Sequence, residues 1–411
     1  MNSAGSINDQ HFDQICHFVI QLGTVAHGYG VSSYRLASFL RRTSEALSVS
    51  GGFQVTPASI NFTFWQDDET TQRSYFLPMA PTTFDMSKLA AIGELVDQVE
   101  AGTLSMEDGV RQLQDIPTKK AQFGAPWVGL GYALAGAGFA VLLSAAWHDV
   151  LLSGVLSLVV FAIVLLAGRY KRVASSLELT ATFTASLLAN AAALVSPGSD
   201  VFIVTLCAVI VLIPGLGLTL GIAEILSRQT VSGISRLVDA LMVTLKLFIG
   251  ATLGTVLIST LVAVPAPVQP PPISAYWTWT FVVLLVVGLA IVFQVRPKDI
   301  GWTVLAGILA YGGVVLGSSA GFWQGSFVGA LLLGAYANLY AWWLRRPTSI
   351  VMLTAIMVLV PGASAYRGLE AVHTAGVASG ISAEWQVLVN IGAILAGLVV
   401  AYSVIPPKAT L

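Results

Sequence analysis

Runs of apolar residues dominate the chain from residue 126 onward, whereas apolar and polar positions are interspersed before it. A bilayer core requires about 20 mostly apolar residues per helix. Runs near that length lie at 126–147, 150–168, 176–195, 201–226, 236–263, 276–295, 300–319, 322–344, 348–372 and 385–405. The pattern predicts an α-helical integral membrane protein with about ten transmembrane helices.

Residues 1–120 are predicted to form a small α+β domain ahead of these helices. Ile60, Phe62 and Phe64 alternate with polar residues, as in a half-buried strand. Two extended stretches, 53–65 and 72–79, are flanked by four stretches in which apolar residues have helical spacing, at 10–27, 32–48, 85–101 and 105–115. We therefore expect a soluble domain joined to a membrane domain.

Two of the predicted spans share a Pro-Gly motif in the same sequence context. Pro214-Gly215 in the fourth span and Pro361-Gly362 in the ninth are 147 residues apart, and the same offset relates Gly221 to Gly368, Ser232 to Ser379 and Gly233 to Gly380. Because a unit of five spans is odd in number, its second copy must cross the membrane in the opposite sense. The sequence predicts an inverted 5+5 repeat over residues 126–263 and 276–405, with a Pro-rich extracytoplasmic connector at 264–275.

Each Pro-Gly pair lies about 13 residues into its span, where it should break the helix. The helix that restarts there presents free N–H groups and a partial positive charge to the membrane interior, which suits a carboxylate. We therefore predict a central substrate-binding site that includes Pro214, Gly215, Pro361 and Gly362. A simple packing kink is the alternative, and the matched second copy favours the site.

Charge predicts how the chain is oriented. Only 10% of the residues are charged, against about 25% in soluble proteins. Lys and Arg fall in alternate loops, at 119–120, 169–172, 228–236, 296–298, 345–346 and 408, whereas the loops between them contain none. Basic loops favour the cytoplasm. Both termini and the N-terminal domain are therefore predicted to be cytoplasmic in a multi-pass protein of the cell (inner) membrane.

Polar side chains inside the spans are candidates for function, because they are costly there. Lys246 could bind a substrate carboxylate or form a structural ion pair with Asp239, one heptad earlier. Asn190 and Asn338 could line the substrate path or hold helices together. The carboxylates considered for proton coupling are Glu178, Asp239 and Glu224, each of which could instead be an interfacial anchor.

The Pro-Gly blocks also carry a resemblance to a known family. Pro214-Gly215 is followed by Glu224, Ser232-Gly233 and Arg236, and the second block runs from Arg345-Arg346-Pro347 through Pro361-Gly362 to Tyr366-Arg367-Gly368-Leu369. The N-terminal domain contains Gly30-Val31-Ser32-Ser33-Tyr34-Arg35. Together these blocks resemble the threonine/serine exporter family of bacterial inner membranes over nearly the whole chain. The chain has Ala37 and Leu220 where that family often has an acidic residue and an asparagine.

The resemblance implies a secondary transporter that exports threonine and serine by proton antiport. Relatives split over two chains resemble dicarboxylate exporters, so a succinate-like substrate is the first alternative. A membrane-anchored hydrolase that acts through the N-terminal domain and a passive channel are the others.

Several further classes of protein are not expected from the sequence. It contains no P-loop, CxxC pair or GxSxG motif and no histidines at a metal-binding spacing, so we expect neither an enzyme nor a bound cofactor or metal. The expected partners are a small amino acid and the lipid bilayer, and a homo-oligomer is compatible with the sequence. Nucleic acid is not expected, because the first 125 residues hold 8 Lys and Arg against 13 Asp and Glu.

Overall fold

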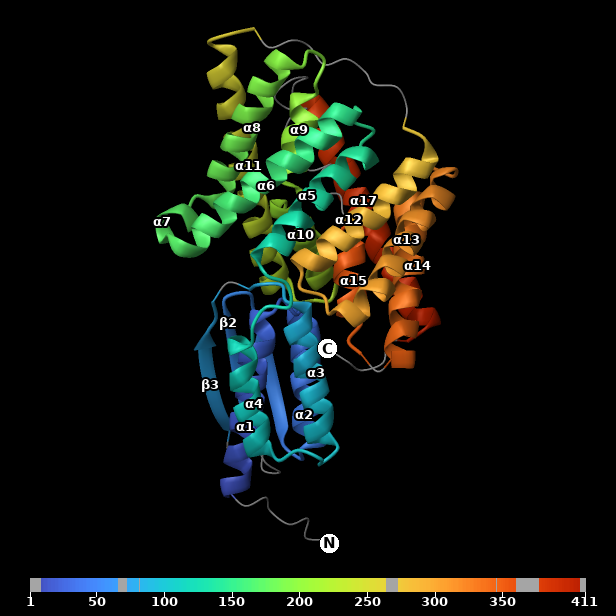
Figure 1. The fold of residues 1–411 in the computed structure, drawn as a ribbon. Helices are drawn as coiled ribbons and strands as arrows, with labels where there is room; N and C mark the ends of the chain where they lie inside the picture. Colours follow the sequence, from blue (N-terminus) through green and yellow to red (C-terminus); the bar gives the residue numbers. More distant parts are fainter. Residues whose placement is uncertain are drawn as a thin grey trace.

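The computed structural model describes residues 9–65, 72–80, 82–263, 273–344, 346–359 and 377–406. It contains an N-terminal α+β domain and a larger body of apolar helices that begins directly beside it (Figure 1). Pro361, Gly362 and most of the 264–275 connector lie outside the described residues, so what the sequence predicts for them remains a prediction.

The N-terminal domain packs helices against a three-stranded antiparallel sheet of order β1-β2-β3 (Figure 1). Ile60, Phe62 and Phe64 point into its core and are fully buried, as their alternation predicts. The elements are α1 (Asp9–Gly28), α2 (Ser33–Ala46), β1 (Ser50–Val55), β2 (Ser59–Trp65), β3 (Gln72–Pro78), α3 (Met86–Glu100) and α4 (Met106–Asp115).

One expectation for this domain is wrong in detail. The stretch 53–65 is two strands rather than one, because the chain turns between Thr56 and Ser59. The N–H of Thr56 donates to the carbonyl oxygen of Ser59 at 2.8 Å, and the N–H of Ser59 donates to the Thr56 hydroxyl at 3.0 Å. Pro57, inside this turn, has no N–H to give to a continuous strand.

The membrane domain contains seven described helices that are long and apolar enough to cross a bilayer, or eight if a bent pair counts as one span. A shorter apolar helix, Tyr276–Val292, adds to these. The predicted span 348–372 is described only at its start. The helices are α5 (Ala125–Leu142), α6 (Trp147–Arg169), α7 (Lys171–Ala174), α8 (Leu177–Val195), α9 (Val201–Ala208), α10 (Gly215–Leu226), α11 (Thr230–Ser259), α12 (Ala275–Val292), α13 (Pro297–Ser318), α14 (Phe322–Leu344), α15 (Ser349–Ile356) and α17 (Val377–Val404).

The helix break expected at Pro214 is present. α9 ends at Ala208, a single 3₁₀ turn follows at Ile210–Leu212, and α10 restarts at Gly215. The segment Val201–Ala208 is bent by 56° relative to Ile210–Leu226. Pro214 cannot donate a hydrogen bond, and the N–H of Gly215 instead donates to the carbonyl oxygen of Ile213 at 2.8 Å. A helix therefore begins part-way along this span.

Two tight turns between successive helices have the same backbone conformation. They are the α5 corner, between α5 and α6, and the α12 corner, between α12 and α13. Ser144 ends the α5 corner with φ +59°, and Gln294 ends the α12 corner with φ +57°. In each corner this residue's N–H bonds back three residues, to Val141 and Ile291 respectively. Five residues after each lies a buried acid in the first turn of the next helix, Asp149 in α6 and Asp299 in α13. Both pairs of equivalent positions are 150 residues apart, close to the offset of the Pro-Gly motifs.

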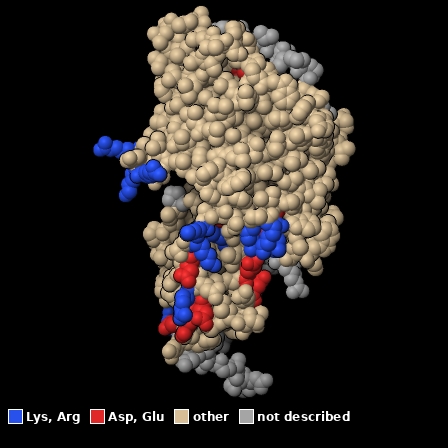
Figure 2. Space-filling view, viewed as in Figure 1, with Lys and Arg blue, Asp and Glu red and all other residues tan. Residues whose placement is uncertain are grey.

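Charged side chains are distributed unevenly over the face shown in Figure 2. Most of the membrane domain carries none there, whereas Lys, Arg, Asp and Glu gather where it meets the N-terminal domain, and Lys and Arg also project over α7. An apolar belt with charges at one end is the surface expected of a protein embedded in a bilayer.

Candidate functional site at the junction of the two domains

The centre of the site is Glu224, which lies near the end of α10 with a side chain that is 0% exposed. Arg236 of α11 donates to it from Nε and from Nη2, both at 3.2 Å, and so holds both carboxylate oxygens. The hydroxyl of Ser232 donates to Oε2 at 2.9 Å. The acid, serine and arginine of one sequence block therefore converge at a single buried carboxylate.

Two glycines bring the helices that carry this carboxylate together. A Cβ on Gly233 of α11 would lie 2.6 Å from the carbonyl oxygen of Gly221 in α10. No side chain fits at that distance, so the helices touch through their backbones. Both glycines belong to the set of identities repeated between the two halves of the sequence, and this contact explains why the positions need glycine.

The N-terminal domain completes the carboxylate site. The N–H of Ser33, at the start of α2, donates to Oε1 of Glu224 at 3.0 Å, and the hydroxyls of Ser33 and Ser232 are 2.6 Å apart. The chain reaches this place through Gly30, whose φ is +82° and where a Cβ would lie 2.5 Å from the Phe84 ring. The free N–H groups at a helix start favour an anion, and here that anion is a side chain of the membrane domain.

Arg35, two residues further on, contacts the other half of the membrane domain. Its Nη1 donates to the hydroxyl of Thr348 at 3.2 Å, just before α15, and its Nη2 donates to the hydroxyl of Tyr402 in α17 at 2.7 Å. Its Nε donates to the neighbouring Tyr34 hydroxyl at 3.2 Å. The segment Gly30–Arg35 therefore lies between α10 on one side and α15 and α17 on the other.

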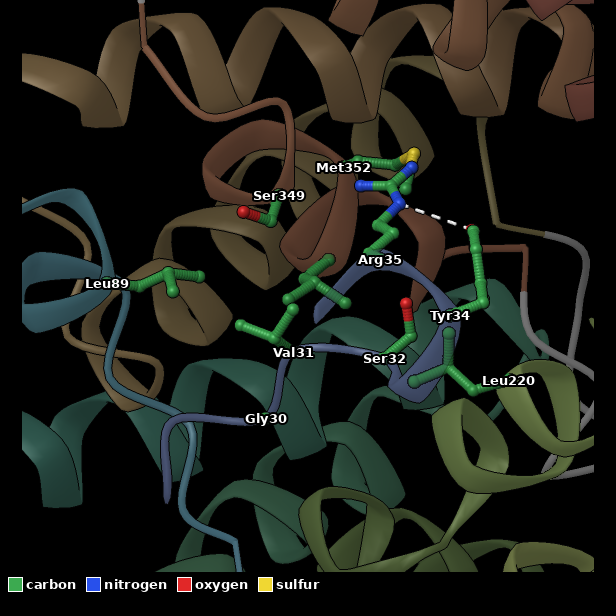
Figure 3. Close-up of a pocket in the computed structure, with 10 residues that line it drawn as sticks. Gly30, Val31, Ser32, Tyr34, Arg35, Leu89, Leu220, Ser349 and Met352 are labelled. Atoms are coloured by element: carbon green, nitrogen blue, oxygen red, sulfur yellow. Dashed lines mark hydrogen bonds between the residues drawn. The ribbon is translucent and has the colours of Figure 1, made fainter. Parts of the chain in front are cut away.

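A small pocket lies within this junction (Figure 3). Arg35 and Tyr34 point into it from α2, Leu220 faces it from α10, and Ser349 and Met352 face it from α15. Its volume is about 40 Å³, enough for a few water molecules and too small for an amino acid. The pocket would therefore have to enlarge before an amino acid could enter it.

His27 lies at the edge of the same junction. It is buried, and its Nε2 is 2.9 Å from the carbonyl oxygen of Thr56. Burial lowers the pKa of His27 below its ordinary value, and the nearby charge of Arg236 lowers it further against the opposing effect of the bond to Thr56. The histidine is therefore neutral in the folded protein at pH 7.

A second set of contacts joins the N-terminal domain to the α12 corner. The N–H of Met86 donates to the carbonyl oxygen of Phe293 at 2.9 Å, and Arg296 donates to Glu94 at 2.7 Å. Arg296 also donates to Asp299 at 3.0 Å. Asp299 is fully buried and in addition accepts from Tyr340 and Arg346. This junction is thus built on ion pairs as well as backbone hydrogen bonds.

The remaining predicted residues lie elsewhere in the membrane domain. Lys246 contacts Glu178 at 3.5 Å and Asp239 is exposed, so the alternative in which Lys246 pairs with Asp239 is wrong. α8 packs along α11, and this long-range pairing determines the partner of Lys246. Asn190 donates to the Thr255 hydroxyl at 3.2 Å.

Asn338 has the same kind of contact as Asn190. It donates to the carbonyl oxygen of Ile405, just beyond α17, at 2.6 Å. Each asparagine therefore bonds a chain segment other than its own helix, the contact that holds helices together. Neither residue lines the junction pocket.

The residues of this site that the sequence does not single out individually are Ser33 and Arg35. Both belong to the block Gly30–Arg35, which the sequence singles out, but nothing in their spacing indicates which part of the membrane domain they contact. Ser32 and Ser33 stand at the start of an amphipathic helix, a pattern that predicts an ordinary helix start. Only the structure shows that the start of this helix is occupied by Glu224.

Comparison with known proteins agrees with these observations. A threonine/serine exporter family model matches residues 17–258, and a second, described as Threonine/Serine exporter, ThrE, matches residues 278–404. The fold and these matches define a membrane protein with several spanning helices. Within that class, the chain belongs to the threonine/serine exporter family, as the Pro-Gly blocks predict.

Fungal proteins are among the curated relatives, and one of the two described next is named as a membrane protein. The chain is 24% identical over 396 residues to an uncharacterized protein of Schizosaccharomyces pombe, covering 93% of this chain and 46% of that protein. It is 25% identical over 366 residues to pheromone-regulated membrane protein 10 of Candida albicans, covering 85% of this chain and 33% of that one. The chain spans less than half the length of these relatives. No solved structure matches it.

Proposed function

We propose that the chain is a secondary transporter that exports threonine and serine from the cytoplasm in exchange for protons. The observation that carries the proposal is the Glu224 site, in which a buried carboxylate at the end of a broken span binds the N-terminal domain. Family membership supports this class of substrate. Broken spans with an ionisable group beside them are common where secondary transporters bind ions and substrates.

The transport path in this proposal runs through an inverted 5+5 repeat. The two corners at Ser144 and Gln294, each followed by a buried aspartate, support the repeat, as do the matching contacts of Asn190 and Asn338. The substrate site lies where the two broken spans meet, at Pro214 and Gly215 and, in the second half, at Pro361 and Gly362. Lys246, Asn190 and Asn338 are assigned to the same path.

Proton coupling is assigned first to Glu224. A proton on this carboxylate would remove the charge to which Ser33, Ser232 and Arg236 all donate, and so would weaken the contact between the domains. Glu178 is a second candidate, since a proton there would release Lys246. Asp239, which is exposed, would act only as a proton acceptor at the membrane surface. The orientation proposed places both termini and the junction in the cytoplasm.

Purified protein in liposomes provides the test. Export of labelled threonine should saturate with concentration, respond to an imposed pH gradient and be inhibited by serine. A passive channel would show neither saturation nor uphill flux. Succinate is the essential comparison, because a cation such as Arg35 or Lys246 can bind a carboxylate of either substrate. If succinate moves and threonine neither moves nor competes, the dicarboxylate assignment replaces ours.

A further inference from the structure

Arg35 differs from the other partly buried arginines in the described parts of the chain. Arg42 contacts Glu100, Arg236 contacts Glu224, and both Arg296 and Arg346 contact Asp299. Among the residues that the structure describes, Arg35 donates only to neutral hydroxyl groups, those of Tyr34, Thr348 and Tyr402. A guanidinium withdrawn from water is costly unless a negative charge compensates it. Its surroundings therefore favour an anion.

The hydrogen bonding of Arg35 leaves two donor groups for that anion. Arginine has five N–H groups, and the three hydrogen bonds described use one on each nitrogen. One N–H remains on each of Nη1 and Nη2. Two adjacent donors of this kind hold the two oxygens of a carboxylate in parallel, which a lysine cannot do.

The side chain also points toward a space that a ligand could enlarge. Arg35 lines the pocket between α2 and α15, with Met352 beside its guanidinium and Ser349 also on the α15 side (Figure 3). The walls come from both halves of the membrane domain and from the N-terminal domain. Because the pocket has room only for molecules the size of water, binding of a larger ligand requires α2 to move away from α10 or α15.

We infer that Arg35 is the anion anchor of the cytoplasmic binding site and holds the carboxylate of the exported substrate. The N-terminal domain is thus part of the substrate path. The ligand class is a small molecule with a free carboxylate, of which an α-amino acid is the case favoured by the proposed function, on which this inference rests. A dicarboxylate would use the same anchor.

Competition by a substrate that lacks its carboxylate tests the anchor. Threonine and the corresponding amino alcohol, in which CH₂OH replaces the carboxylate, are compared as inhibitors of threonine flux in liposomes. Threonine should inhibit the wild type at a concentration roughly tenfold to a hundredfold lower than the amino alcohol, because it alone forms charge-assisted hydrogen bonds with the arginine. Arg35→Gln should lose most of this preference, and Arg35→Lys should keep part of it. Arg42→Gln, on the same helix beside Glu100, is the matched control and should keep it.

Two further measurements separate the possible failures. Thr348→Val and Tyr402→Phe remove hydroxyl partners of Arg35 without removing its charge, so these variants should retain the preference if the arginine acts on substrate. If Arg35→Gln does not fold, Arg35→Lys replaces it, and an unchanged preference there overturns the anchor. An unchanged preference for threonine in a folded Arg35→Gln protein also overturns the anchor.

A wild type that moves neither threonine nor succinate would refute the proposed function instead. The anchor is then judged by ligand-induced thermal stabilisation of the purified protein. A carboxylate ligand that stabilises the wild type and not Arg35→Gln supports it. Equal stabilisation of both proteins, or none of either, rejects it.

Discussion

The backbone N–H of Ser33 donates to the carboxylate of Glu224 at 3.0 Å, although the two residues are 191 positions apart and belong to different domains. Glu224 is also held by Ser232 and Arg236 from its own domain. One carboxylate thus controls a contact between a helix start and a broken span. A change of charge at this single position therefore acts on both domains at once.

Glu224→Gln should loosen the junction and lower stability. The change leaves Arg236 partly buried without its acid, and breaking a buried pair in this way costs about 3–5 kcal/mol. We expect a lower melting temperature and faster proteolysis between the domains, together with a flattened dependence of flux on pH. Glu107→Gln, at the exposed start of α4, is the control and should change none of these. If the flux through Glu224→Gln depends on pH as in the wild type, Glu224 is not the proton-coupling residue.

The contact between α10 and α11 predicts a sharp difference between two glycines. Gly233→Ala places a Cβ 2.6 Å from the Gly221 carbonyl oxygen, so the helices must separate, at a cost of about 1–3 kcal/mol. Gly168→Ala, in α6, meets no atom within 4 Å and should be neutral or slightly stabilising. Thermal unfolding of the two purified variants measures the difference, and equal melting temperatures would refute the close contact.

The buried histidine predicts acid sensitivity of the N-terminal domain. Since the pKa of His27 is lowered in the folded state, the unfolded chain takes up its proton first, at about pH 6.5. Stability should therefore be fully present above that pH and fall as the pH decreases below it. Hydrogen exchange of α1 and β1 in the full-length protein, measured from pH 7.5 to about pH 5, should show this loss. His27→Gln should reduce the slope, whereas His17→Gln, at an exposed position, should not.

The orientation is open to a labelling test. Tyr170 and Val195, before and at the end of α8, are 60% and 87% exposed, and the native Cys16 and Cys207 are buried. Val195→Cys should react with a membrane-impermeant thiol reagent in intact cells, and Tyr170→Cys should react only after the membrane is opened. Labelling of position 170 from outside would show that the chain has the opposite orientation in the membrane.

How much of this the sequence could predict depends on the range of the interaction. The helices of the N-terminal domain, most membrane spans and the break at Pro214 follow from local patterns, because periodicity and proline chemistry act over a few residues. The partner of Lys246 and the contact of Ser33 with Glu224 depend on which helices become neighbours. A single sequence contains no signal for which helices become neighbours. It therefore predicts Glu224 and the Pro-Gly motif as parts of the site, but not the contacts that the N-terminal domain makes with them.

The break at Pro214 itself provides the final test. If α10 offers free N–H groups to a substrate carboxylate, a continuous helix should abolish them, and Pro214→Ala with Gly215→Ala favours such a helix. Losing one or two charge-assisted bonds should weaken apparent affinity roughly tenfold to several hundredfold. Membrane insertion should change little, because a continuous apolar helix satisfies its own backbone.

A break that serves only packing predicts the opposite pattern for the same double variant. The yield of folded protein would then fall, while the protein that survives would retain near-normal affinity, because no substrate contact is lost. Flux measured against threonine concentration and normalised to folded protein separates the two cases. Pro197→Ala, in the loop between α8 and α9, removes a proline outside any helix and should leave both quantities unchanged. An unaltered affinity in the double variant would remove Pro214 and Gly215 from the substrate site.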